Sequence, residues 1–149
     1  MREEVLLAHL REVFDRHGRK PDLVVDNGDD GAIFAPQGKD VVIAADVAVE
    51  DVHFKREWSS SFDIARKITA ANLADICAMG GWPQYLLVTA VIPTAWLEES
   101  IAIAQGIVHE ANLVGAAVIG GDLSTGTELS LSITAVGYVE KKKIGRAHV

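Results

Sequence analysis

Four acidic segments, separated by apolar stretches, constrain the fold of this chain more than any other feature of its sequence. They lie at residues 27–30, at Asp46 with residues 50–54, at residues 72–75 and at residues 120–122. Carboxylates held close together repel one another, so a fold that gathers these segments needs cations between them. Hard oxygen ligands suit Mg²⁺, which usually accompanies phosphate groups. The acidic segments therefore predict nucleotide or phosphoryl chemistry.

Composition limits the class of protein. The 149 residues, 49% of them hydrophobic, suffice for one globular domain with its own core. The net charge of −7 and the scattered basic residues argue against a nucleic-acid partner. No apolar run is long enough to cross a bilayer and the N-terminus lacks a signal peptide, so we expect no membrane partner and a cytoplasmic location. The single cysteine, Cys77, excludes an internal disulfide and fits a reducing compartment.

The apolar periodicity predicts alternating helices and strands. Helices are expected over residues 3–17, 60–79 and 94–115, and strands over residues 32–35, 40–45, 85–92, 117–119 and 129–139. Ser60 is expected to cap the second helix, with Asp63 as its capping-box partner. Leu129, Leu131 and Ile133 alternate with polar residues, which is typical of antiparallel strands covered on one face. We therefore expect an α/β (α+β) domain whose mixed, largely antiparallel sheet has helices packed on one face.

The first two acidic segments each allow a functional and a structural interpretation. Asp30 belongs to a glycine-bracketed segment that is either a ligand-binding loop or a surface turn. Asp46 follows the apolar run 41–45, where a carboxylate indicates either a site at a strand end or a strand cap. His53 lies beside an aromatic residue and near two acids; a lone histidine is more often structural, but this one could hydrogen-bond a substrate phosphate or ring.

The last two segments add a helix and a glycine-rich stretch. Asn72 and Asp75 are three residues apart on the second helix and share a face. Their neighbours are apolar, and a carboxylate there lowers stability unless it is paired or binds a cation, which favours a functional role. Gly120 and Gly121 would let the backbone approach a phosphate, with Asp122 holding a metal ion beside it. A single Gly-Gly-Asp is a weak signal that the other three segments strengthen.

The order of these motifs resembles the ATP-binding half of the thiamine-monophosphate kinases. The motifs are G-D-D, D-x-x-V-E-x-x-H-F, N-L-x-D-x-x-A-M-G and G-G-D, within about residues 26–139. The superfamily also includes aminoimidazole ribonucleotide synthetase, selenophosphate synthetase and a hydrogenase maturation factor. The pairs His53-Phe54 and Trp58-Ser59 favour the kinase over these relatives.

The resemblance implies the N-terminal domain of the aminoimidazole ribonucleotide synthetase-like fold and a direct, in-line phosphoryl transfer from ATP to thiamine monophosphate, giving thiamine diphosphate. It implies Asp30, Asp46, Asp75 and Asp122 as Mg²⁺ ligands, Gly121 and Asp122 at the ATP site, and His53 at the thiamine phosphate. It also implies a homodimer formed through the sheets. Another ATP-dependent synthetase of the superfamily, or a non-catalytic dimerisation or nucleotide-binding module, remains an alternative.

The sequence departs from the family at three places. Ala44 and Ala45 stand where hydroxyl residues often help to bind metal. Residues 1–143 correspond to the N-terminal ATP-binding domain alone, so we expect a fragment without its C-terminal domain and without activity of its own. Residues 144–149 could be encoded by ATC GGA AGA GCA CAC GTC, the start of a common sequencing adapter, which predicts a non-native tail; the alternative is a native polar tail.

Overall fold

The computed structural model describes residues 3–18, 20–28 and 30–141. The predicted non-native tail, residues 144–149, lies outside this range. The elements in chain order are α1 (Glu3–Phe14), β1 (Leu23–Val25), β2 (Ile33–Phe34), β3 (Asp40–Val49), α2 (Ser61–Ala78), β4 (Trp82–Val91), the 3₁₀ helix η1 (Thr94–Glu99), α3 (Ser100–Leu113), β5 (Ala117–Ser124) and β6 (Ser130–Val139).

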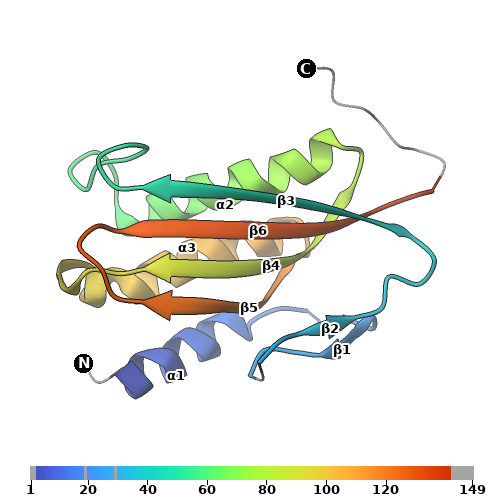
Figure 1. The fold of residues 1–149 in the computed structure, drawn as a ribbon, viewed down its shortest axis with the longest axis horizontal. Helices are drawn as coiled ribbons and strands as arrows, with labels where there is room; N and C mark the ends of the chain where they lie inside the picture. The colour runs from blue at the N-terminus through green and yellow to red at the C-terminus, as the bar shows by residue number, and fades with distance from the viewer. Residues whose placement is uncertain (1–2, 19, 29, 142–149) are drawn as a thin grey trace.

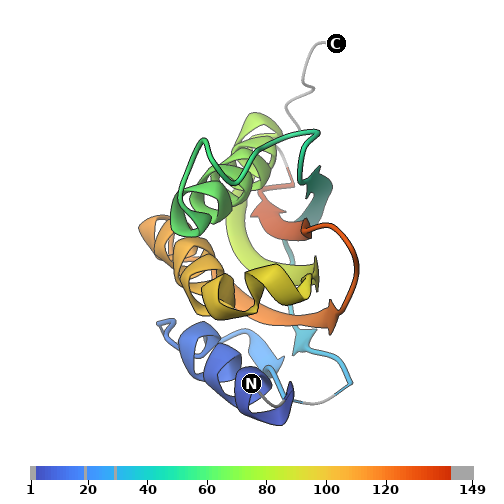
Figure 2. The ribbon, with the colours of Figure 1, turned by 90° about the vertical axis from the view of Figure 1, so that its left-hand side faces the viewer.

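The main sheet has four strands in the order β3-β6-β4-β5 (Figure 1). β6 runs antiparallel to both β3 and β4, whereas β4 and β5 are parallel. The helices α2 and α3 lie on one side of this sheet (Figure 2). The predicted mixed, largely antiparallel sheet with helices on one face is therefore confirmed. A separate pair, β1 and β2, forms a small antiparallel sheet.

The hydrophobic core lies between the main sheet and the helices. Alternate residues of β6, including Leu131, Ile133 and Ala135, are buried there with Ile64 and Ile76 of α2. Full burial of one such aliphatic side chain contributes about 1.5–3 kcal/mol. The period-two pattern seen in the sequence of β6 thus points its apolar residues at the helices.

The predicted cap of α2 is confirmed. The Ser60 hydroxyl accepts a hydrogen bond from the Asp63 backbone N–H at 3.1 Å, and it donates to the Asp63 carboxylate at 2.8 Å. The helix ends at Ala78, with Met79 as its C-cap residue, and Gly80 follows with a φ of +74°, which glycine adopts without strain. This cap and stop fix the position of the acidic motif within the helix.

Several element boundaries differ from the prediction. The strands β3 and β5 run further than expected, to Val49 and Ser124, because the ladders with β6 and β4 continue past Asp46 and Asp122. The expected third helix divides into η1 and α3, and α1 ends at Phe14. The strand β1 was not predicted. Among the helices that the structure describes, none combines the length and apolarity needed to cross a bilayer.

Candidate functional site

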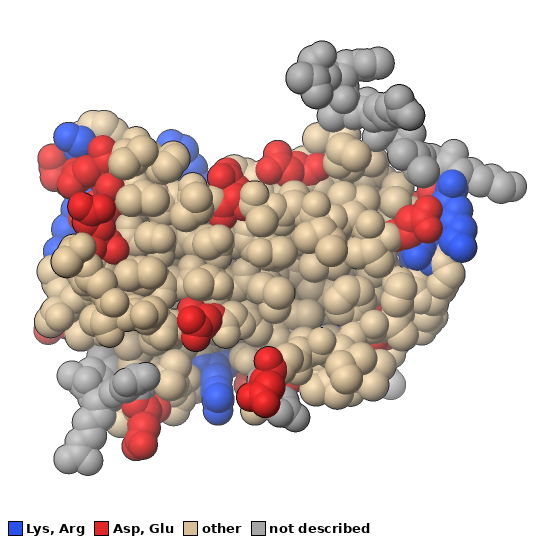
Figure 3. Space-filling view, in the orientation of Figure 1, with Lys and Arg blue, Asp and Glu red and all other residues tan. Residues whose placement is uncertain are grey.

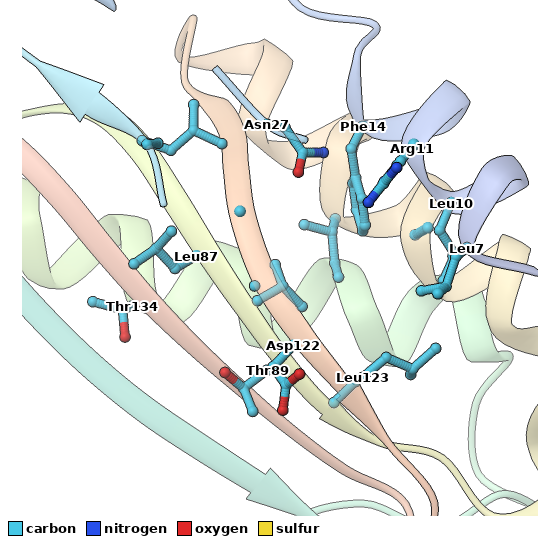
Figure 4. Close-up of a pocket in the computed structure, with 18 of the residues that line it drawn as sticks. Leu7, Leu10, Arg11, Phe14, Asn27, Leu87, Thr89, Asp122, Leu123 and Thr134 are labelled. Atoms are coloured by element: carbon cyan, nitrogen blue, oxygen red, sulfur yellow. The ribbon is translucent and has the colours of Figure 1, made fainter. Parts of the chain in front are cut away.

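A cavity of about 600 Å³ lies between α1, the turn after β1 and the edge strand β5 (Figure 4). The helix α1 contributes Arg11 and Phe14 to its wall, and the sheet contributes Thr89 and Asp122. The turn contributes Asn27 and Asp30. The cavity therefore has an apolar wall, a cationic side chain and a group of oxygen atoms, a mixture that is typical of sites for small-molecule ligands.

This cavity brings two of the four acidic segments together. Gly28 and Asp30 line it from the turn, and Gly121 and Asp122 line it from β5. Asp122 pairs in register with Thr89 of β4, and Figure 4 shows the two side chains next to each other. Carboxylate and hydroxyl oxygens are the hard ligands that Mg²⁺ prefers, so the oxygen atoms of the cavity are of the type that suits this ion.

Gly121 has a second, structural reason to be glycine. Its φ is +156°, and a Cβ added to it would overlap the carbonyl oxygen of Val88 in the neighbouring strand. The register between β4 and β5 shifts just before this point, between Leu86 and Leu87. The backbone of Gly121 thus packs closely against β4, a contact that the sequence motif alone did not reveal.

Asp46 lies away from this cavity, within β3 rather than after it. The strand β3 is at the edge of the sheet opposite β5, and its residue Ile43 is 65% exposed. The expected strand is present, but the prediction that it ends before Asp46 was wrong, because it runs on to Val49. Asp46 shares the helix-facing side with Ala44 and Ala48, which pack against the core. Its carboxylate accepts a hydrogen bond from the Val47 N–H at 2.8 Å.

The motif in α2 places an amide, not a carboxylate, in the core. Asn72 is completely buried, and its Nδ2 donates to the Ile68 carbonyl oxygen at 3.0 Å. Its Oδ1 is buried without a hydrogen-bond partner among the described residues. Asp75 is exposed, so the argument that burial forces it to bind a cation was wrong. Cys77 is exposed as well.

His53 also lies outside the cavity, in the loop between β3 and α2. Its side chain is exposed, and its Nδ1 accepts a hydrogen bond from the Val49 N–H at 3.1 Å. The start of this loop is fixed by Glu50, whose Oε2 accepts from Trp96 Nε1 at 2.8 Å and from the Leu129 N–H at 3.2 Å. Across residues 3–18, 20–28 and 30–141, no three His, Cys, Asp or Glu side chains are grouped closely enough to hold a metal ion.

An anchor for the β1–β2 pair escaped the sequence interpretation. The hydroxyl of Tyr138 donates a hydrogen bond to the carboxylate of Asp22, just before β1. The ring centroids of Phe34 in β2 and Tyr85 in β4 lie 5.0 Å apart. Burial opposes ionisation of Asp22, but hydrogen bonding, chiefly from Tyr138, and the charge of Lys20 outweigh it, so the pKa of Asp22 lies below its usual value. These contacts hold the turn with Asp30 against the sheet. In the sequence, Asp22 is an acidic residue next to Pro21, and this pattern does not predict these contacts.

Comparison with known proteins agrees with this geometry. The family model described as AIR synthase related protein, N-terminal domain, matches residues 28–139. The thiamine-monophosphate kinase of Bacillus subtilis is 42% identical over 117 residues, which are 76% of this chain and 36% of that protein.

Solved structures show the same fold. The structure of thiamine-monophosphate kinase from Stenotrophomonas maltophilia K279a has a TM-score of 0.80 and 33% identity, covering 98% of this chain and 45% of that one. A complex of AaThiL with AMPPCP and TMP has a TM-score of 0.63 and 24% identity, covering 94% and 44%. The resemblance predicted from the motifs is confirmed, and the chain spans less than half the length of these relatives.

Proposed function

We propose that this chain, which belongs to the AIR synthase related protein family through its N-terminal domain, is the ATP-binding domain of a thiamine-monophosphate kinase. The observation that carries the proposal is the cavity that Asp30, Gly121 and Asp122 line together. The names of the relatives at 42% and 33% identity support thiamine monophosphate as the phosphoryl acceptor. Because this chain covers only 36% and 45% of them, we propose that residues 1–143 bind nucleotide and do not complete the reaction alone.

The described residues have distinct tasks in this proposal. Gly121 and Asp122 line the ATP site, and His53 contacts the phosphate of the acceptor. Asp30, Asp46, Asp75 and Asp122 would hold Mg²⁺, which when bound neutralises charge on the phosphate oxygens. The chain's own contribution is positioning, because in-line phosphoryl transfer depends on alignment of the reacting groups.

A homodimer would account for the separation of Asp46 from Asp122. Beyond the part packed against β1 and β2, the side of the sheet away from the helices exposes Val41 (40%), Ile43 (65%), Val47 (44%) and Leu87 (37%). Figure 3 shows this side as a broad surface with few charges over the strands. Unpaired apolar surface of this kind is typical of an interface between proteins. If the sheets of two subunits together close a barrel, both edges of each sheet meet the partner subunit, so Asp46 on β3 and Asp122 on β5 would each border it.

Nucleotide binding can be tested on this chain directly. Calorimetry with a non-hydrolysable ATP analogue should show binding that needs Mg²⁺ and disappears when the metal is chelated. Asp122→Asn should weaken it at least about tenfold, because a ligand to a charged group is lost. The matched control is Glu98→Gln, the same change on an exposed residue of η1, which should bind like the original.

Two results would contradict the proposal. A folded sample that binds no analogue with Mg²⁺ present would remove the nucleotide site from this domain. Equal binding by Asp122→Asn and the original would separate nucleotide binding from the metal ligands, as expected of a non-catalytic module.

We also propose a cytoplasmic location, which fits an ATP-dependent reaction and a chain whose single cysteine, Cys77, forms no internal disulfide.

A further inference from the structure

The turn after β3 holds the His53 side chain against its own backbone. The carbonyl oxygen of Val49 accepts hydrogen bonds from the N–H groups of Val52 at 3.2 Å and His53 at 2.9 Å. The N–H of the same Val49 donates to Nδ1 of the His53 ring at 3.1 Å. The backbone and the ring of His53 are therefore both bonded to one residue, which fixes the imidazole relative to the strand.

The chemistry of the donor determines the protonation of the ring. A backbone N–H can only donate, so Nδ1 must carry a lone pair and no proton. In a neutral imidazole the proton then resides on Nε2. Since the ring is exposed, His53 offers a hydrogen-bond donor outside the turn, while its acceptor nitrogen is occupied by Val49.

Asp51 makes this turn possible at a conformational cost. Its φ is +62°, in the left-handed region that residues other than glycine rarely adopt. Its N–H donates to the carbonyl oxygen of Phe54 at 2.8 Å, and Phe54 is buried with its ring 6.5 Å from the ring of Trp96. Strained backbone persists where its surroundings enforce it, and here the buried Phe54 on one side and the bonds of Glu50 on the other do so.

We infer that Asp51 is a positioning residue whose left-handed turn presets His53 as the Nε2–H tautomer, so that His53 acts on the acceptor phosphate as a hydrogen-bond donor and not as a base. The identity of the acceptor rests on the proposed function; the tautomer does not. A preset donor orients a phosphate oxygen without a further proton transfer, which is the positioning that phosphoryl transfer needs.

The tautomer can be measured by ¹⁵N NMR of the histidine rings at a pH where they are neutral. His53 should show an unprotonated Nδ1 and a protonated Nε2, assigned by its absence from His53→Gln. His9, exposed on α1, provides the comparison within the same sample. A proton on Nδ1 of His53, or the mixture of tautomers that a free histidine shows, would overturn the inference.

Two substitutions test the role of Asp51. Asp51→Gly should keep the single tautomer because glycine adopts this φ freely, whereas Asp51→Val should convert His53 to a mixture. The matched control is Gln37→Val, since Gln37 has a φ of +48° in a separate turn. This control should leave His53 unchanged. A single Nε2–H tautomer in folded Asp51→Val would contradict the role of the turn.

Binding of thiamine monophosphate, with Mg²⁺ and an ATP analogue present, addresses the role of the donor. The amide N–H₂ of His53→Gln reaches about as far as Nε2, and that of His53→Asn about as far as Nδ1. His53→Asn should therefore bind at least about tenfold more weakly than His53→Gln. Equal binding by the two variants would refute the donor role, whereas absence of binding to the original chain would refute the proposed acceptor and leave the measured tautomer standing.

Discussion

Replacing Gly121 by alanine should destabilise the whole domain, although the change adds one methyl group at the surface of β5. The φ of +156° is costly for an L-residue, about 1–3 kcal/mol, and the added Cβ would overlap the carbonyl oxygen of Val88. Relief of such an overlap by backbone movement costs about another 1–3 kcal/mol. The sum of about 2–6 kcal/mol is a large part of the about 5–15 kcal/mol that stabilises a typical domain.

Thermal unfolding followed by circular dichroism would measure this effect. At this chain length each kcal/mol changes the Tm by about 2–4 °C, so Gly121→Ala should lower it by about 4–24 °C. Gly18→Ala is the matched control: a Cβ at Gly18 meets no atom within 4 Å, and its φ lies outside the range that favours glycine. The control should change stability by less than about 1 kcal/mol. A Gly121→Ala variant as stable as the control would refute the close approach of β5 to β4.

Two further predictions concern the dimer and the β1–β2 anchor. Ile43→Glu should raise the dimer dissociation constant about 100-fold or more, because an unpaired charge buried in an interface costs about 3 kcal/mol or more. Light scattering would measure the loss of the dimer. The control is Val24→Glu on β1, which should stay dimeric because Val24 is 66% exposed. Because the pKa of Asp22 is lowered in the folded state, its ionised form stabilises the fold above about pH 3.9, and this contribution is lost as the pH falls through the lowered pKa. The variant Asp22→Asn also lacks the charged acceptor for Tyr138, so it should lose less stability on acidification than the original protein. Urea unfolding at several pH values would measure this, and equal losses would contradict the lowered pKa of Asp22.

The types of the long elements were predictable because their local signals agree with the fold. The hydroxyl of Ser60 indicates the start of a helix, and the alternation of apolar and polar residues in β6 indicates a strand. Both local patterns agree with the way these elements pack in the core. The ends of β3 and β5 were not predictable. The segments with Ala44, Asp46 and Gly121 have low strand propensity, but partner strands supply their ladder bonds and override it.

The candidate site was predictable in part. The sequence analysis expected the acidic segments to be gathered by the fold, and of their proposed metal ligands Asp30 and Asp122 do line one cavity. The assignment of Asn72 and Asp75 to one environment failed because a step of three residues rotates the helix by about 60° short of a full turn. At the border of a buried face this rotation separates a buried amide from an exposed carboxylate. The local sequence pattern carries no information about which residues a second subunit would supply.

The position of β6 governs the order in which this domain can be built during synthesis. β6 lies between β3 and β4, and it pairs residues as distant as Asp40 and Val139. The helices α2 and α3 and the parallel pair β4–β5 can assemble from segments already made, but β3 has no neighbour in the main sheet until β6 arrives. Until then a nascent chain presents unpaired strand edges and an unfilled core, the features that recruit chaperones or cause aggregation. Folding of the sheet is therefore a late, non-local event, and its rate depends on how fast this one strand inserts.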